Sequence, residues 1–142
     1  MGEDATSDKL AIALFSGTVD RLQAAATMAA GAAAMGMETH IFLMFWGVDA
    51  FRKDVIDTTR PVSAEYGDRG KEVAAAMEAK GVPPWHAVLR MAADVGDLHV
   101  HACAMTMDLL DIPMEHLDPM VEDVIGVATF VELSRDGNIL FI

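Results

Sequence analysis

Residues 9–45 read KLAIALFSGTVDRLQAAATMAAGAAAMGMETHIFLMF, and this stretch decides the fold class. Two short apolar runs, Lys9–Phe15 and Thr39–Phe45, enclose an alanine-rich segment that starts at Thr18 and ends at Gly36. Short apolar runs bounded by turn residues are typical of strands buried on both faces of a parallel sheet. Thr18 suits a helix N-cap, and Gly36 suits a left-handed C-cap. The stretch therefore predicts a strand–helix–strand unit whose helix packs against the sheet.

The rest of the sequence continues this alternation of strands and helices. The predicted helices cover about Ala50–Thr58, Lys71–Lys80, Pro83–Gly96 and Gly126–Arg135, with a further turn or helix start at Ala104–Asp108, and the predicted strands are Leu98–Cys103, Val121–Ile125 and Asn138–Ile142. Strands that alternate with helices indicate a mostly parallel sheet. We therefore predict one α/β domain over residues 1–142, a three-layer α/β/α sandwich with a sheet of about five strands. Residues 1–8 are expected to be flexible.

Composition narrows the class of protein. The 142 residues carry a formal net charge of −12, 53% of them are hydrophobic, and one is a cysteine. One cysteine cannot form an internal disulfide, which excludes a secreted disulfide-stapled fold. The acidic balance argues against binding to nucleic acid or to anionic lipid, because both need an excess of Lys and Arg.

We expect neither a targeting signal nor a membrane span. Met1–Asp8 is polar and acidic, without the basic and apolar regions of a signal peptide. Leu22–Met37 is the longest uncharged run, but it is mostly alanine. A membrane span needs about 20 strongly apolar residues, so this run predicts a buried helix. We therefore expect a cytoplasmic protein.

Three predicted turns follow the carboxyl ends of strands, where open parallel sheets bind their ligands. They contain Ser16, Gly17 and Thr18 after the first strand, Trp46 and Gly47 after the second, and Cys103 to Thr106 after the third. A helix that starts just after Cys103 would offer backbone N–H groups and partial positive charge, which favour the reactive thiolate. The alternative is that Cys103 is a small buried hydrophobic residue, as free cysteines often are. Position alone leaves both alternatives open.

The third strand also raises the question of a metal site. Its alternation places His99, His101 and Cys103 on one face. The outer two of these residues lie about 13 Å apart along the strand, so one ion could bind only two of them and would need other ligands. Hydrogen-bonded histidines are the commoner outcome, and His101 could instead act as a base or a cation beside the thiolate. Cys103, Met105 and Met107 would suit Cu(I), but methionines more simply fill gaps in a core. We assign no metal and no cofactor.

Other chemistry has little support in the sequence. Ser16-Gly17-Thr18 could bind an anion at a helix start, but it lacks the lysine and the glycine spacing of a P-loop. The dinucleotide-binding fingerprint and the serine-hydrolase elbow are both absent. The cysteine is therefore the leading candidate for chemistry.

Four segments together resemble the DsrE/DsrF/DsrH-like family of small sulfur-relay proteins. They are residues 9–53, which contain AMGMETHIFLMFWG, together with HACAMTMDLLDI (101–112), VIGVATFVEL (124–133) and NILFI (138–142). The sequence is most similar to the stand-alone DsrE-like branch, whose members are often labelled peroxiredoxin-like. The resemblance implies a five-stranded α/β/α domain that forms homo-oligomers.

The same resemblance implies that Cys103 is the functional cysteine, which carries sulfane sulfur as a persulfide. The partners that it implies are TusA-type sulfur carriers and rhodaneses. Backbone N–H groups near Ala104 and Met105 would stabilise the anionic persulfide, and the Thr106 hydroxyl could add a donor. No second cysteine is needed in the chain, because a partner thiolate would remove the sulfur.

Two other functions stay open beside a sulfurtransferase or sulfur carrier. The first is a non-catalytic homo-oligomeric scaffold in which Cys103 is buried and unreactive. The second is a soft-metal binding protein that uses Cys103 with His101 or Met105. The sulfur relay is the leading hypothesis.

Overall fold

The computed structural model describes residues 8–142, so residues 1–7 of the segment predicted to be flexible lie outside the described residues. The strands are β1 (Lys9–Leu14), β2 (Glu38–Leu43), β3 (Leu98–Cys103), β4 (Val121–Ile125) and β5 (Asn138–Phe141). The helices are α1 (Val19–Ala34), α2 (Trp46–Ala50), α3 (Asp68–Ala79), α4 (Trp85–Val95), α5 (Ala104–Leu110) and α6 (Val127–Leu133), with short 3-10 helices η1 (Ala64–Tyr66) and η2 (Met114–His116).

The strands form one sheet in the order β4-β3-β2-β1-β5. Each neighbouring pair is parallel. The predicted sheet of about five mostly parallel strands is therefore confirmed, and it is parallel throughout.

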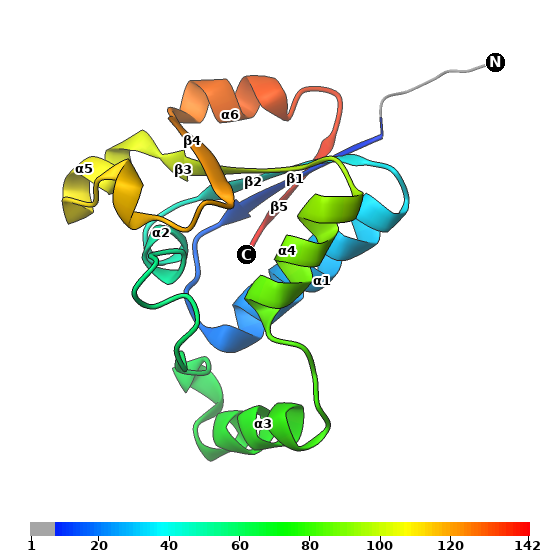
Figure 1. Cartoon of the computed structure of the whole chain (residues 1–142), viewed down its shortest axis with the longest axis vertical. Helices are drawn as coiled ribbons and strands as arrows, with labels where there is room; N and C mark the ends of the chain where they lie inside the picture. Colours follow the sequence, from blue (N-terminus) through cyan, green and yellow to red (C-terminus); the bar gives the residue numbers. More distant parts are fainter. Residues whose placement is uncertain (1–7) are drawn as a thin grey trace.

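The helices cover the two faces of the sheet unequally. Figure 1 shows α1 and α4 side by side on one face, α6 on the other, and α3 at the far end of the molecule away from the sheet. The connections β1–β2 and β2–β3 step along the sheet in one direction, so right-handed crossovers place α1 and α4 on the same face. The connection β4–β5 runs back across the sheet and places α6 opposite them. The predicted three-layer architecture is confirmed, with α6 as one outer layer.

The larger core lies between the sheet and the pair α1 and α4. It contains Ile12, Ile41 and Val100 from the strands, Leu22, Ala25 and Ala29 from α1, and Trp85 and Leu89 from α4. Small side chains let the two helices approach closely: a Cβ atom added at Gly96 would lie 2.6 Å from the Cβ of Ala33. The alanine-rich sequence of α1 is therefore explained by contact with both the sheet and α4.

A smaller core lies under α6. Its buried members are Ala11, Ala13, Phe42, Cys103 and Phe130. The rings of Phe42 and Phe130 stack with their centroids 4.7 Å apart and their planes 12° apart. Phe130 is the buried hydrophobic residue of α6, so this one aromatic contact anchors much of the outer layer.

One predicted helix is misplaced, and another starts later than the observed one. The structure has α2 at Trp46–Ala50 and turns after it, in place of a helix over Ala50–Thr58. The segment after α2 is held by tertiary contacts instead: the Lys53 N–H donates to the His116 carbonyl at 2.9 Å, and Arg52 forms a β-bridge with Leu117. The helix predicted from Lys71 begins earlier, at Asp68.

Within residues 8–142, none of the helices is both long and apolar enough to cross a membrane.

Candidate functional site

The three turns predicted to meet at the carboxyl edge of the sheet do lie together. The Gly47 N–H donates to the Phe15 carbonyl at 3.1 Å, which joins the turns after β2 and β1. A Cβ atom on Gly17 would lie 2.8 Å from the Trp46 carbonyl oxygen. The Phe45 N–H donates to Thr106 Oγ1 at 3.1 Å, which joins the turns after β2 and β3.

The polar groups of the turn after β1 hold a distant segment of chain. Ser16 Oγ and Thr18 Oγ1 lie 3.1 Å apart, and Thr18 Oγ1 lies 3.2 Å from Ser63 Oγ. The Val19 N–H at the start of α1 donates to the Pro61 carbonyl at 2.9 Å. Arg60 donates from Nε to the Gly17 carbonyl at 2.5 Å. These groups therefore fasten residues 60–63 to the start of α1.

Arg60 itself was not among the candidates from the sequence. Its Nη2 lies 3.2 Å from Asp49 Oδ2, so the guanidinium is paired with a carboxylate. Together with Phe15, Trp46 and Pro61 it lines a cavity of about 360 Å³ over the turn.

Cys103 occupies a different side of this edge. It is the last residue of β3 and directly precedes α5. Its side chain is 4% exposed and packs in the small core under α6, with Phe42 and Phe130. Because α1 covers the other face of the sheet, the thiol does not face Ser16 and Thr18. Of the residues that follow Cys103, Ala104 is half-buried, Met105 is exposed and Thr106 is buried.

A hydrogen-bonded row of four side chains crosses the sheet on the same face as Cys103. His40 Nε2 lies 2.6 Å from Glu38 Oε2, and His40 Nδ1 lies 2.9 Å from His101 Nε2. His101 Nδ1 lies 2.6 Å from Asp123 Oδ1. We call Glu38, His40, His101 and Asp123 the histidine row. Both ring nitrogens of His101 are occupied within the row, which leaves neither for the Cys103 thiol.

His99 stands beside the row, with carboxylates at both ring nitrogens. Its Nδ1 lies 2.8 Å from Glu122 Oε1, and its Nε2 lies 2.6 Å from Asp97 Oδ1. Partial burial of the ring acts to lower the pKa of His99, but the hydrogen bonds with Glu122 and Asp97 outweigh it and the pKa is raised. In the row itself, the hydrogen bond with His40 holds the pKa of Glu38 below its ordinary value.

A β-bulge brings the carboxylates of β4 to the histidines. β4 pairs Val121 with Val100 and Asp123 with His101, so Glu122 is an extra residue in this pair of strands. An ordinary strand points consecutive side chains to opposite faces, whereas a bulge can re-aim one of them. Glu122 and Asp123 consequently both reach histidines of β3.

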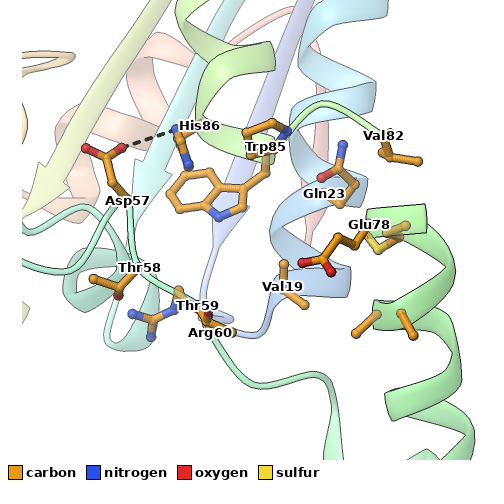
Figure 2. Close-up of a pocket in the computed structure, with 14 residues that line it drawn as sticks. Val19, Gln23, Asp57, Thr58, Thr59, Arg60, Glu78, Val82, Trp85 and His86 are labelled. Carbon is orange, nitrogen blue, oxygen red and sulfur yellow. Dashed lines mark ion pairs between the residues drawn. The ribbon is translucent and has the colours of Figure 1, made fainter. Parts of the chain in front are cut away.

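A larger cavity, of about 590 Å³, lies elsewhere, among α1, α3 and α4. Figure 2 shows Trp85 and Gln23 at this cavity, with Glu78 across from them and His86 next to Asp57. The dashed line marks the His86 Nδ1 to Asp57 Oδ1 distance of 3.5 Å. Cys103 does not line this cavity, so the cavity and the thiol are separate features of the molecule.

Comparison with known proteins identifies the family. The model of the DsrE/DsrF/DrsH-like family matches residues 6–68 and 65–142, which together span almost the whole chain. The chain belongs to the DsrE/DsrF/DrsH-like family. The resemblance seen in the sequence is thus confirmed.

One curated protein and one solved structure are similar to this DsrE-like chain. Uncharacterized protein YrkE from Bacillus subtilis (strain 168) is 34% identical over an alignment of 153 positions, which covers 92% of this chain and 94% of YrkE. The solved structure of MTH1491, a protein of unknown function from Methanobacterium thermoautotrophicum, matches with a TM-score of 0.59 and 14% identity. That match covers 95% of this chain and 99% of MTH1491, and at this identity it supports the fold alone.

The feature of this DsrE-like site that sequence reasoning missed is the histidine row. His101 was a candidate, but His40, Glu38 and Asp123 were not. His40 lies in an apolar strand segment with nothing around it that marks a site. The register that sets His40 opposite His99, and Phe42 opposite His101, is what brings the rings together.

Thr106 gives this DsrE-like site a first testable prediction. Its buried hydroxyl accepts the N–H of Phe45, a bulky residue with φ 49° and ψ −114°, a sparsely populated conformation. Thr106→Val keeps the shape of the side chain but leaves this N–H without its partner. We expect the free energy of unfolding to fall by about 1–3 kcal/mol in urea denaturation. Thr106→Ser keeps the hydroxyl and should recover most of the loss; equal stability of wild type and Thr106→Val would contradict the assignment.

Proposed function

We propose that this DsrE-like protein is a sulfur-relay protein, which holds sulfane sulfur as a persulfide on Cys103 and passes it to a partner thiol. The observation that supports this most is the position of its single cysteine. Cys103 ends β3 at the carboxyl edge of the sheet, directly before α5. This edge is where open parallel sheets bind their substrates.

The proposed chemistry needs one thiolate and no cofactor. The Cys103 thiolate attacks the outer sulfur of a donor persulfide, R–S–SH. A bond forms between Cys103 Sγ and that sulfur, the donor S–S bond breaks, and R–S⁻ leaves with the electron pair. An acceptor thiolate then attacks the outer sulfur of Cys103–S–SH in the same way, and Cys103 returns as a thiolate. One sulfane sulfur passes between thiols without net oxidation.

Groups next to Cys103 support the anionic persulfide in this scheme. The first N–H groups of a helix have no partner inside the helix. Those of Ala104 and Met105, at the start of α5, are the donors nearest in sequence to the sulfur and would stabilise the negative charge. The Thr106 hydroxyl already accepts the Phe45 N–H, so its first role is to hold the end of β2.

Burial of the thiol favours a second candidate function. Cys103 is 4% exposed, and a thiol that never becomes accessible would fit a non-catalytic homo-oligomeric scaffold. The sulfur relay therefore requires α6 to open, because α6 and its Phe130 cover this side of the sheet. Sulfur uptake, together with labelling of the native thiol, separates the two candidates.

The exposed apolar side chains suggest how partners would dock. Trp46, Met105 and Leu109, at the carboxyl edge, are each more than half exposed. Exposed apolar patches often mark interaction sites, and we propose that this patch receives a TusA-type carrier or a rhodanese. A second exposed set on α6 and β5 would serve a homo-oligomer; it comprises Val127, Val131, Ile139 and Phe141.

A single free thiol suits the reducing cytoplasm, where we place the protein.

Intact-protein mass spectrometry after incubation with polysulfide or tetrathionate tests the function. The wild-type protein should gain sulfur from polysulfide, and thiosulfonate from tetrathionate, in a form that a reductant removes. Cys103→Ser should gain neither, a complete loss, since it removes the single cysteine of the chain.

Thiol labelling provides the control for this experiment. The native wild-type protein should react with a small alkylating reagent without denaturant. A wild-type protein that takes up no sulfur, and whose thiol labels only after global unfolding, would overturn the relay and leave the scaffold as the better function.

A further inference from the structure

The histidine row needs more hydrogen atoms than two neutral imidazoles can supply. A carboxylate only accepts hydrogen bonds. The contacts of His40 Nε2 with Glu38 and of His101 Nδ1 with Asp123, both 2.6 Å, therefore each need a ring N–H. The 2.9 Å contact between His40 Nδ1 and His101 Nε2 needs another. A neutral imidazole carries one N–H, so the row is complete only with one additional proton.

The arrangement of the two rings fits a proton between the nitrogens. The ring centroids of His40 and His101 lie 5.2 Å apart, and the ring planes differ by 17°. The centroid distance exceeds the 2.9 Å N···N distance by about two ring radii, so the two nitrogens lie close to the line that joins the ring centres. This is the geometry of a straight N–H···N hydrogen bond. A shared metal ion would instead require both nitrogens to point at a position beside that line.

The groups around the pair also favour a retained positive charge. His40 and His101 are 5% and 3% exposed, and burial of a charge is costly unless opposite charges compensate it. The two carboxylates of the row provide that compensation. A ring nitrogen of His101 and the carboxylates of Glu122 and Asp123 lie within 4.8 Å of one another. Each carboxylate already has a ring as its partner, since Glu122 hydrogen-bonds with His99 and Asp123 with His101.

We propose that His40 and His101 bind one proton between them at neutral pH, as a singly charged imidazolium–imidazole pair that ties β2, β3 and β4 together. With this proton bound, all the hydrogen bonds of the row form. Without it, the lone pairs of His40 Nδ1 and His101 Nε2 face each other. The row therefore makes this half of the sheet sensitive to pH. This inference does not depend on the proposed sulfur chemistry.

The direction of the pH effect follows from proton counting. In an unfolded chain a histidine loses its proton near pH 6.5, so above that pH the native row holds one proton that the unfolded residues do not. Stability then falls as pH rises, and the equilibrium constant for unfolding increases by up to about tenfold per pH unit until the native proton is lost. The other charged groups around the row are Lys9 from β1, which lies 3.6 Å from Glu38, and His99 from β3 with its two carboxylate partners, Asp97 just before β3 and Glu122 in β4. On the α6 side, Glu132 pairs with Arg135, and both are exposed.

NMR of protein with ¹⁵N-labelled histidine tests the proposal directly. At pH 7 we expect one of the two rings to carry a proton on both of its nitrogens at any moment, while the other ring is neutral. We also expect a coupling across the hydrogen bond between His40 Nδ1 and His101 Nε2. Raising the pH should remove the signal of the doubly protonated ring and the coupling together, in a single step. Two neutral rings at pH 7 with no coupling between them would overturn the proposal.

Two asparagine variants make the stability measurement specific. In His40→Asn, the amide can donate to a neutral His101 Nε2, so no additional proton is needed. The part of the pH dependence above about pH 6.5 that comes from the row should then disappear, and the part that comes from His99 should remain. His99→Asn removes a histidine that stacks 5.0 Å from His40 but is not part of the row. Because the pKa of His99 is itself raised, this variant should lose the part of the pH dependence that His99 contributes and keep the part that the row contributes. The same pH dependence in wild type and His40→Asn would count against a shared proton; if His40→Asn does not fold, the NMR result on the wild type decides.

Discussion

Gly47→Ala is expected to prevent stable folding of this DsrE-like protein. A Cβ atom at this position would lie 2.1 Å from the Leu14 carbonyl oxygen and 3.1 Å from the carbonyl carbon. Both are backbone atoms at the end of β1, so no side-chain rotation can relieve the clash. The Gly47 N–H also donates to the Phe15 carbonyl, and the clash would break this contact. We expect the free energy of unfolding to fall by about 4 kcal/mol or more.

Circular dichroism with urea denaturation measures this effect, and the chain offers a matched control. A Cβ atom at Gly31, in the middle of α1, would meet nothing within 4 Å. Gly31→Ala should therefore keep or increase stability, by up to about 1 kcal/mol, because alanine is the better helix former. A Gly47→Ala protein as stable as the wild type would show that α2 does not pack against β1 in solution as it does in the structure.

Phe130→Ala is expected to speed the modification of Cys103 by about a hundredfold or more. Phe130 is 4% exposed, stacks on Phe42 and shares its small core with the cysteine. Removal of a buried phenylalanine ring costs about 3–5 kcal/mol, and each 1.4 kcal/mol is about a tenfold change in an equilibrium. If α6 must lift to expose the thiol, the population of the open form should rise accordingly. The rate of reaction with a small disulfide reagent under native conditions measures it.

An exposed residue of the same helix is the control for this prediction. Val131 is 56% exposed, so Val131→Ala should change the labelling rate little. Urea then distinguishes local opening from global unfolding, because local opening exposes little surface and depends weakly on the denaturant. A labelling rate unchanged by Phe130→Ala would mean that reagents reach Cys103 by a path that does not involve α6.

The sequence predicts the parts of this molecule that are determined locally. The runs Lys9–Phe15 and Thr39–Phe45 carry their apolar signal within a few residues, and each contains a strand of the parallel sheet. The segment after β2 was harder, because Arg52 and Lys53 are held by contacts with residues near 116 and not by a repeating pattern. A short range of sequence holds no information about such contacts.

The candidate site likewise has one part that the sequence predicts and one part that it does not. The turns with Gly17, Gly47 and Thr106 could be placed together, because the carboxyl ends of parallel strands share one edge. The histidine row could not, since it depends on the register of β2 against β3 and on the bulge at Glu122. Neither the register nor the bulge has a signature in a single sequence, so His40 looked like an isolated polar residue in an apolar strand.

The place of β5 beside β1 has a consequence for how the molecule is built. The register joins Leu10 to Asn138, so the pairing closes a loop that contains almost all of the chain between them. Contacts between such distant residues form late, because the entropy of loop closure must be overcome first. During synthesis, one edge of β1 stays unpaired until residues 138–141 leave the ribosome. Until then α6 also lacks the strand that follows it. The layer over Cys103 is therefore among the last parts of the molecule to assemble, and the thiol of the nascent chain stays in contact with solvent until synthesis is nearly complete.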